Sequence, residues 1–158
     1  MNTGHAPVNS TASRSLGHIV LNVRSLAAST PFYCRVLGLR EVARNAERQM
    51  VFLSFGANDH DIALRQAERT ANGHDESAVG LRQVAFRVGD ALGELRAFRA
   101  HLEASGVPIR RIHEHVASTS IYFSDPDGIE LEAYIEHPGE MWRGERQAAR
   151  FSKPVQLD

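Results

Sequence analysis

Three polar side chains that are far apart in the sequence carry the donor atoms of a metal site. His18 offers an imidazole nitrogen, Gln83 an amide oxygen and Glu132 a carboxylate. If the fold brings these atoms to one point, they form a three-ligand site on one face of a metal ion, with open positions for a substrate. A plainer interpretation exists for His18, because a lone histidine at the head of an apolar run such as GHIVLNV is more often a packed core or edge residue. The surrounding elements decide between these interpretations.

A second group of side chains has the chemistry for proton transfer. His113 and His115 in RIHEHVAS share one face of a strand, and Tyr122 follows on the next strand. An imidazole exchanges protons near neutral pH, and a tyrosine hydroxyl can hold an oxyanion. The alternative is that both histidines lie on a solvated strand edge. No function is assigned to four further histidines in expected turns or on a polar helix face: His60, His74, His101 and His137.

Composition limits what kind of site can form. The 158 residues match one domain or two half-size modules with a shared core, and 18 Lys and Arg against 19 Asp and Glu leave no basic field for nucleic acid. The first 15 residues lack the apolar core of a signal peptide, and no run approaches the ~20 apolar residues of a membrane span. We therefore expect a cytoplasmic protein. Cys34 is the only cysteine, so a metal must use His, Glu, Asp or amide oxygen.

The chain contains one module written twice. We expect a flexible arm at 1–15, a first repeat at 16–66, a linker at 67–79, a second repeat at 80–136 and an extension at 137–158. Each repeat consists of a strand, a helix and three strands. The first has strands at 16–23, 40–44, 50–55 and 61–66 and a helix at 26–37, and the second has strands at 81–88, 109–115, 119–124 and 129–136 and a helix at 91–106.

This duplication predicts the fold class and the place of the site. We expect an α+β protein in which two β-α-β-β-β repeats form a curled mixed sheet around a central cleft. His18 and Gln83 begin equivalent strands, and Glu132 lies on the last strand opposite Ala63 of the first repeat. All three candidate ligands can therefore point into the same cleft.

The last strand of the second repeat, in DPDGIELEAYIE, has two distinct faces. Period-two alternation puts Glu130, Glu132 and Tyr134 on the face that lines the cleft. Asp125 and Asp127 flank a proline and precede a glycine, which is typical of a tight turn.

From about residue 16 to 142 the sequence resembles the vicinal oxygen chelate superfamily, which contains glyoxalase I, type I extradiol ring-cleaving dioxygenases, and fosfomycin- and bleomycin-resistance proteins. The segments that carry the resemblance are LGHIVLNVRSL, PFYCRVLGL, FLSFGANDHDIAL, VAFRVGD, LEASGVPI and IYFSDPDGIELEAY. SFGANDHDIALRQ and HVASTSIYFSDPDG are most similar to the small single-domain proteins that resemble catechol 2,3-dioxygenase.

The resemblance implies a ligand set with one departure. The group uses a histidine on the first strand of each repeat and a glutamate on the last strand, which correspond to His18, Gln83 and Glu132. Glutamine replaces the second histidine here, as it does in some glyoxalases, and its uncharged oxygen holds Fe(II) less well than imidazole does. The fourth ligand of glyoxalases corresponds to Ala63, which cannot coordinate a metal.

The activity implied first is that of an extradiol-type, ring-cleaving dioxygenase on a small aromatic or enediol-type substrate chelated through vicinal oxygens. Its metal would be Fe(II), with Mn, Zn or Ni as alternatives, and the catalytic residues would be His115 as the acid/base histidine and Tyr122 as the substrate-binding tyrosine. The alternatives are a metal-dependent glyoxalase-like isomerase or lyase, and a metal-free protein that binds a small molecule for resistance.

We also expect a homodimer, because each half-sheet leaves edges and apolar cleft rims to cover. The tail after His137, with Met141, Trp142 and Phe151, adds apolar surface. The cleft can form within one chain or between the repeats of two chains.

Overall fold

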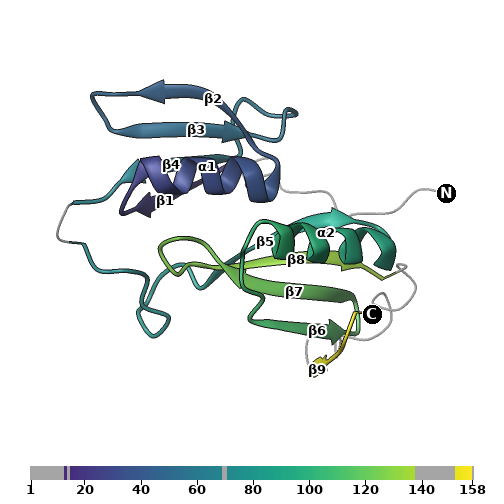
Figure 1. Cartoon of the computed structure of the whole chain (residues 1–158). Coiled ribbons are helices and arrows are strands. Elements are labelled where there is room, and N and C mark those ends of the chain that lie inside the picture. Colours follow the sequence, from purple (N-terminus) through teal and green to yellow (C-terminus); the bar gives the residue numbers. More distant parts are fainter. Residues whose placement is uncertain (1–12, 14, 69–70, 138–151, 158) are drawn as a thin grey trace.

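The computed structural model describes residues 13, 15–68, 71–137 and 152–157, which form two mixed β-sheets and two helices (Figure 1). Sheet A has the strand order β1-β4-β3-β2, and sheet B has the order β5-β8-β7-β6-β9. The predicted α+β class is therefore confirmed. The elements are β1 (Ile19–Val23), α1 (Leu26–Leu37), β2 (Arg40–Asn45), β3 (Met50–Ser54), β4 (Ile62–Gln66), β5 (Gln83–Gly89), α2 (Leu92–Ala104), β6 (Arg111–His115), β7 (Ser118–Ser124), β8 (Glu130–Glu136) and β9 (Ser152–Pro154).

The two repeats have the same internal pairing. In each repeat the first and last strands run parallel, β1 with β4 and β5 with β8, and the remaining neighbours run antiparallel. The registers also agree, because Val20 pairs with Ala63 and Ala85 pairs with Glu132. Ala63 thus occupies in sheet A the position that Glu132 has in sheet B, as the repeat predicted.

Local signals explain where the helices begin and end. The Ser25 hydroxyl accepts a hydrogen bond from the Ala28 amide at 3.3 Å and caps α1. The chain leaves both helices through a glycine with positive φ, Gly38 at 74° and Gly106 at 68°. The left-handed turn at these equivalent positions sends the chain from each helix back into its sheet.

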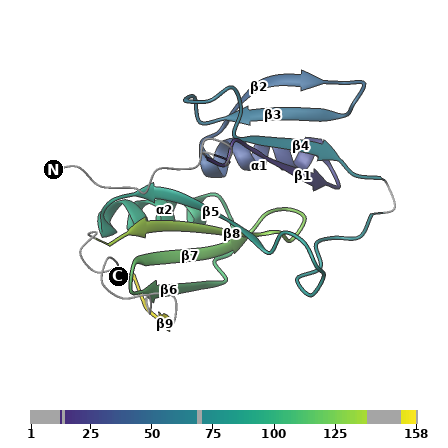
Figure 2. The same cartoon turned by 180° about the vertical axis from the view of Figure 1, so that it is seen from behind.

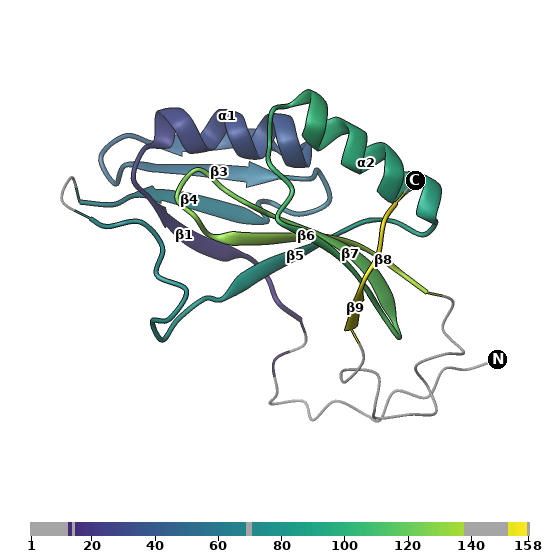
Figure 3. The ribbon, with the colours of Figure 1, turned by 60° about the horizontal axis from the view of Figure 1, so that its bottom comes forward.

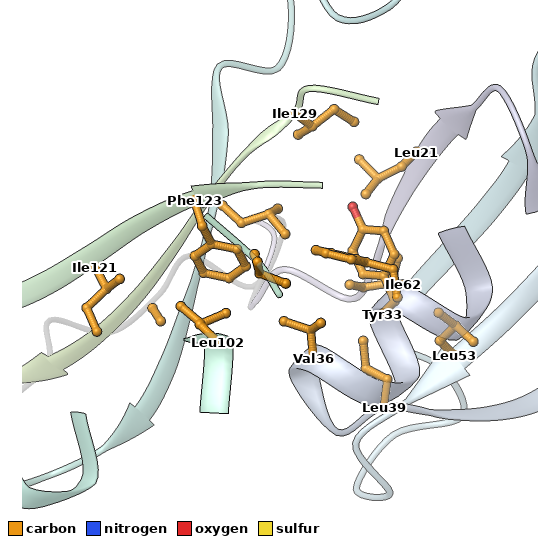
Figure 4. Close-up of a cluster of buried hydrophobic side chains, with 14 of the residues drawn as sticks. Leu21, Tyr33, Val36, Leu39, Leu53, Ile62, Leu102, Ile121, Phe123 and Ile129 are labelled. Carbon is orange, nitrogen blue, oxygen red and sulfur yellow. The ribbon is translucent and has the colours of Figure 1, made fainter. Parts of the chain in front are cut away.

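Both helices lie on the same side of the two sheets (Figure 3). The apolar side chains of the sheets point toward them and form one core that spans both repeats. Tyr33 and Val36 of α1, Leu102 of α2 and Phe123 of β7 are all buried in it (Figure 4). The repeats therefore share a core and form one folding unit.

Within one chain, the two sheets do not curl around each other. The sequence predicts a curled mixed sheet made by the two repeats, and in the structure each repeat forms its own mixed sheet. The two sheets lie side by side, and the faces opposite the helices point away from them (Figures 2 and 3). The physical reason is the shared core, which draws the apolar faces of both sheets to the same side.

The end of the chain adds a strand that the repeat does not predict. β9 pairs antiparallel with β6, and Leu157 after it is buried in the core. The apolar tail residues expected at a dimer interface, Met141, Trp142 and Phe151, lie outside the described residues, as does most of the arm at 1–15. Among the described elements, neither helix is long and apolar enough to cross a membrane.

The turn before β8 joins the two repeats through buried polar contacts. Asp125 accepts hydrogen bonds from the amides of Asp127 and Ile129, which confirms the predicted turn. Its carboxylate also accepts the Tyr33 hydroxyl at 3.0 Å, and Asp127 forms an ion pair with Arg24 at 2.6 Å. Burial raises the pKa of Asp125 above its usual value. Asp125 and Asp127 thus connect this turn to α1, through Tyr33, and to the end of β1, through Arg24.

Removing the Tyr33 hydroxyl should destabilise the protein. We expect Tyr33→Phe to lower the free energy of unfolding by about 1–3 kcal/mol, because the buried Asp125 carboxyl loses the donor to its second oxygen. Urea denaturation at constant pH measures this change. Tyr134→Phe is the control, since no hydrogen bond of its hydroxyl is found among the described residues, and it should change the value by less than about 0.5 kcal/mol. Equal effects of the two substitutions would show that the Tyr33 contact is not specific.

Candidate metal and substrate site

Sheet B has one apolar face and one polar face. On β8, Leu131, Ala133 and Ile135 pack into the core, and Glu130 and Glu132 lie on the other face, as alternation predicts. Polar side chains from the neighbouring strands share this second face: Gln83, Arg111, His113, His115, Ser120, Tyr122 and Ser124. We call this surface the polar face of sheet B.

Glu132 is the centre of a hydrogen-bond network on the polar face. Glu132 is 9% exposed, and its carboxylate accepts hydrogen bonds from three donors: Gln83 Nε2 at 2.6 Å, Ser120 Oγ at 2.6 Å and the Tyr122 hydroxyl at 3.2 Å. The Tyr122 hydroxyl also lies 3.0 Å from Nε2 of His115. Two of the three predicted ligands and both predicted catalytic residues are therefore joined in one network.

The environment of Tyr122 keeps its hydroxyl protonated. Burial raises its pKa, and the negative charge of Glu132 raises it further. The guanidinium carbon of Arg111 lies 3.9 Å from the centre of the ring. The Tyr122 hydroxyl has one proton, which it donates to Glu132. In its contact with His115 it is therefore the acceptor, and His115 Nε2 is the donor. The direction of donation then runs from His115 through Tyr122 to Glu132.

His18 lies on the other sheet. It directly precedes β1 on the face of sheet A that points away from the helices, and its side chain is exposed rather than part of the core. Its ring centre is 4.3 Å from that of His60, whose Nδ1 is 2.8 Å from the Asp59 carboxylate. Phe52 packs edge-on against His60. Among the described residues, no hydrogen bond joins His18 to Gln83 or Glu132.

Comparison with known proteins identifies the family. Residues 15–133 match the model of the Glyoxalase/Bleomycin resistance protein/Dioxygenase superfamily. The chain belongs to this superfamily. A crystal structure of a glyoxylase/bleomycin resistance protein/dioxygenase domain from Frankia sp. EAN1pec is similar in fold, with a TM-score of 0.68 and 23% identity over 80% of this chain and 100% of that one.

Two relatives within the superfamily are dioxygenases by name. The biphenyl-2,3-diol 1,2-dioxygenase 2 of Rhodococcus globerulus is 28% identical over 127 residues, and the catechol-2,3-dioxygenase of Bacillus subtilis is 30% identical over 132 residues. These matches cover 80% and 84% of this chain. The chain spans only 65% and 45% of the lengths of those two enzymes.

The metal ligands expected in this superfamily are only partly assembled in one chain. No cluster of three His, Cys, Asp or Glu side chains suited to a metal occurs within the part of the chain that the structure describes. Gln83 contacts the Glu132 carboxylate through its amide nitrogen, and an iron site with three protein ligands needs a further donor beside these two residues. These two residues fit a divalent metal once an imidazole joins them from elsewhere.

Several residues around the site were missed by sequence reasoning. Ser120 could have been found, because it lies two residues before Tyr122 and so on the same face of β7. His60 was set aside as a turn residue, and its position beside His18 follows from the parallel pairing of β1 with β4. The contact of Arg111 with Glu130 joins strands β6 and β8, and neither repeat nor alternation predicts which charged groups pair across a sheet.

The charge of Glu132 should be visible in the titration of Tyr122. We expect Glu132→Gln to lower the pKa of the Tyr122 hydroxyl, because a carboxylate that opposes phenolate formation is removed. The pKa is measured by NMR on protein labelled at the tyrosine ring carbon that bears the hydroxyl. Glu136→Gln, with an exposed carboxylate at the end of the same strand, is the control and should leave the value unchanged. An unchanged Tyr122 pKa in both variants would contradict the network.

Proposed function

We propose that this protein is a metal-dependent enzyme of the extradiol dioxygenase type, acting on a small aromatic or enediol-type compound with vicinal oxygens. The observation that carries the proposal is the network in which Gln83 and Glu132 lie beside His115 and the protonated hydroxyl of Tyr122. Family membership and two relatives named as dioxygenases support it.

In this proposal His18, Gln83 and Glu132 hold the metal, with Fe(II) first among the candidates. When bound, Fe(II) supplies adjacent positions for two substrate oxygens and for O2. Glu132 contributes the only negative charge among the three ligands. The Gln83 amide, whose nitrogen donates to Glu132, keeps its oxygen free for the metal.

The chain's own residues have separate roles around the substrate. When substrate is bound, the Tyr122 hydroxyl donates its one proton to a substrate oxygen instead of to Glu132, and its raised pKa keeps that proton on the hydroxyl. His115 exchanges a proton through Nε2 along the same network. His60 is a second imidazole beside the ligand His18, and its contact with Asp59 through Nδ1 leaves Nε2 for proton transfer.

We further propose that each site is completed by a second copy of the chain. The outer face of sheet A carries His18, His60 and Phe52 together with Val20, which is 50% exposed. This face and the polar face of sheet B point the same way, away from the helices (Figure 2). A two-fold axis that places sheet A of one copy over sheet B of the other would bury both faces and form two equivalent sites.

A mixing experiment tests this arrangement. His18→Ala and Glu132→Ala should each lose bound metal while keeping the fold. After the two variants are unfolded and refolded together in equal amounts, half of the dimers are mixed, and each mixed dimer has one intact site of two. About a quarter of the wild-type metal content and activity should therefore return. If the site lies within one chain, nothing returns, and a monomer mass in light scattering would exclude the shared site.

A metal-free binding protein is the second candidate, and one observation favours it. The three donors to Glu132 satisfy its carboxylate within the chain. In that case Gln83 is a hydrogen-bonding residue of a pocket that sequesters a small molecule. A glyoxalase-like isomerase or lyase would use the same ligands to polarise a carbonyl without O2. Such an enzyme would not turn over catechol, whether or not it is loaded with iron.

Substitution of Gln83 separates these functions. For an Fe(II) dioxygenase, Gln83→His should tighten iron binding and keep or raise ring cleavage, because imidazole is the stronger donor to Fe(II). Metal content and catechol turnover are measured for both proteins after anaerobic iron loading. Gln83→Ala is the control and should bind iron more weakly than the wild type. A wild-type protein that stays empty while Gln83→His fills would favour the metal-free binding protein.

A further inference from the structure

A cluster of three arginines borders the polar face of sheet B. Arg111 donates to both carboxylate oxygens of Glu130, at 2.6 and 2.8 Å. Arg110 lies 3.5 Å from the same carboxylate and donates to Glu76 at 2.6 Å. Arg82 lies 3.8 Å from Glu130 and 3.4 Å from Glu76. We call these five residues the arginine cluster.

The arginine cluster holds more positive than negative charge. Glu130 is fully buried, and Arg111 donates a hydrogen bond to each of its carboxylate oxygens. With Glu76 it offsets two of the three guanidinium charges, which leaves a net charge of about +1. Arg82 is 51% exposed and has no hydrogen bond among the described residues, since both of its ion pairs are longer contacts. Its N–H donors are therefore available to a ligand.

The cluster lies at one end of the candidate site. Glu130 and Glu132 are two residues apart on the same face of β8, which corresponds to about 7 Å along a strand. Gln83 pairs with Glu130 across β5 and β8, so Arg82 lies next to a candidate metal ligand in the chain. Arg111 connects the two groups directly, because its guanidinium covers the ring of Tyr122.

We propose that the arginine cluster binds a carboxylate at the far end of the substrate, with Arg82 as the main contact. This inference rests on the proposed function and names its substrate class: an aromatic vicinal diol that carries a carboxylate opposite one of its hydroxyls. The separation of Glu130 from Glu132 is close to the length of a benzene ring with substituents at opposite positions. Guanidinium groups recognise carboxylates through paired hydrogen bonds, and the two glutamates hold the arginines in place for this contact.

The plainer interpretation of the cluster is a structural one. Glu76 lies in the linker between the repeats, and its ion pairs with Arg82 and Arg110 fasten that linker to sheet B. A purely structural cluster predicts that Arg82→Gln changes stability and not substrate preference. The two interpretations therefore differ in a measurable way.

Binding of matched ligands tests the proposal. Calorimetry on the metal-loaded protein compares 3,4-dihydroxybenzoate with 3,4-dihydroxybenzamide, which has the same hydroxyls and a neutral group of similar size. We expect the wild type to bind the carboxylate about tenfold more tightly or better, as charge-assisted hydrogen bonds allow. Arg82→Gln should abolish this preference by weakening binding of the carboxylate to the level of the amide, and Arg82→Lys should retain part of the preference.

Controls make the outcomes distinct. Arg96→Gln removes the same charge from the exposed face of α2 and should keep the full preference. Thermal unfolding of every variant verifies that the fold is intact. If the amide binds as tightly as the carboxylate, or if Arg82→Gln keeps the preference, the inference is wrong, while turnover of either diol leaves the proposed function standing. If neither diol binds or reacts, the inference is wrong, and catechol turnover after iron loading decides the proposed function separately.

Discussion

The shared core beneath the two helices determines what each sheet can present to its surroundings. Both sheets have one apolar face, and the residues of both faces pack with α1 and α2 in a single cluster (Figure 4). Buried polar contacts add to this arrangement, because the turn before β8 binds Tyr33 and Arg24 of the first repeat. Once the apolar faces are used in this way, the polar face of sheet B and the histidine-bearing face of sheet A are left pointing outward. The candidate site follows from that arrangement.

Much of the fold could be predicted from sequence, because hydrophobic periodicity and internal repetition are local signals. The alternation in IELEAYIE placed Glu132 on the correct face, and the repeat placed Ala63 in the equivalent position of sheet A. The relation between the sheets could not be derived in this way. Repetition shows that two units are alike, but it does not show which faces of those units meet. β9 was missed for a related reason, since a short exposed strand outside the repeat carries no periodic signal.

In the candidate site, too, residues identified by local sequence patterns could be predicted, and contacts that depend on strand pairing could not. Gln83, Glu132, Tyr122 and His115 were all named from sequence, and they form one hydrogen-bond network. The sequence indicates no function for His60, because its neighbour His18 is distant in sequence and only the pairing of β1 with β4 brings them together. Gln83 can act both as a hydrogen-bond donor to Glu132 and as an oxygen ligand, and sequence alone does not show which of these roles it has. One amide group satisfies the carboxylate beside it and still presents an oxygen to a metal or a ligand.

The parallel pairings that hold β1 and β5 in place have a consequence for how the protein moves. Each is an edge strand with a single neighbour in its sheet, and its partners, such as Ile62 for Ile19 and Glu130 for Gln83, lie more than forty residues away along the chain. The central strands β3, β4, β6, β7 and β8 have neighbours on both sides. Edge strands closed by long loops detach at a lower free energy than the centre of a sheet does, so their amides exchange with solvent first. β1, which directly follows His18, and β5, which begins at Gln83, can therefore open without global unfolding. This gives the two halves of the proposed shared site a route to separate and reassemble while each core stays intact.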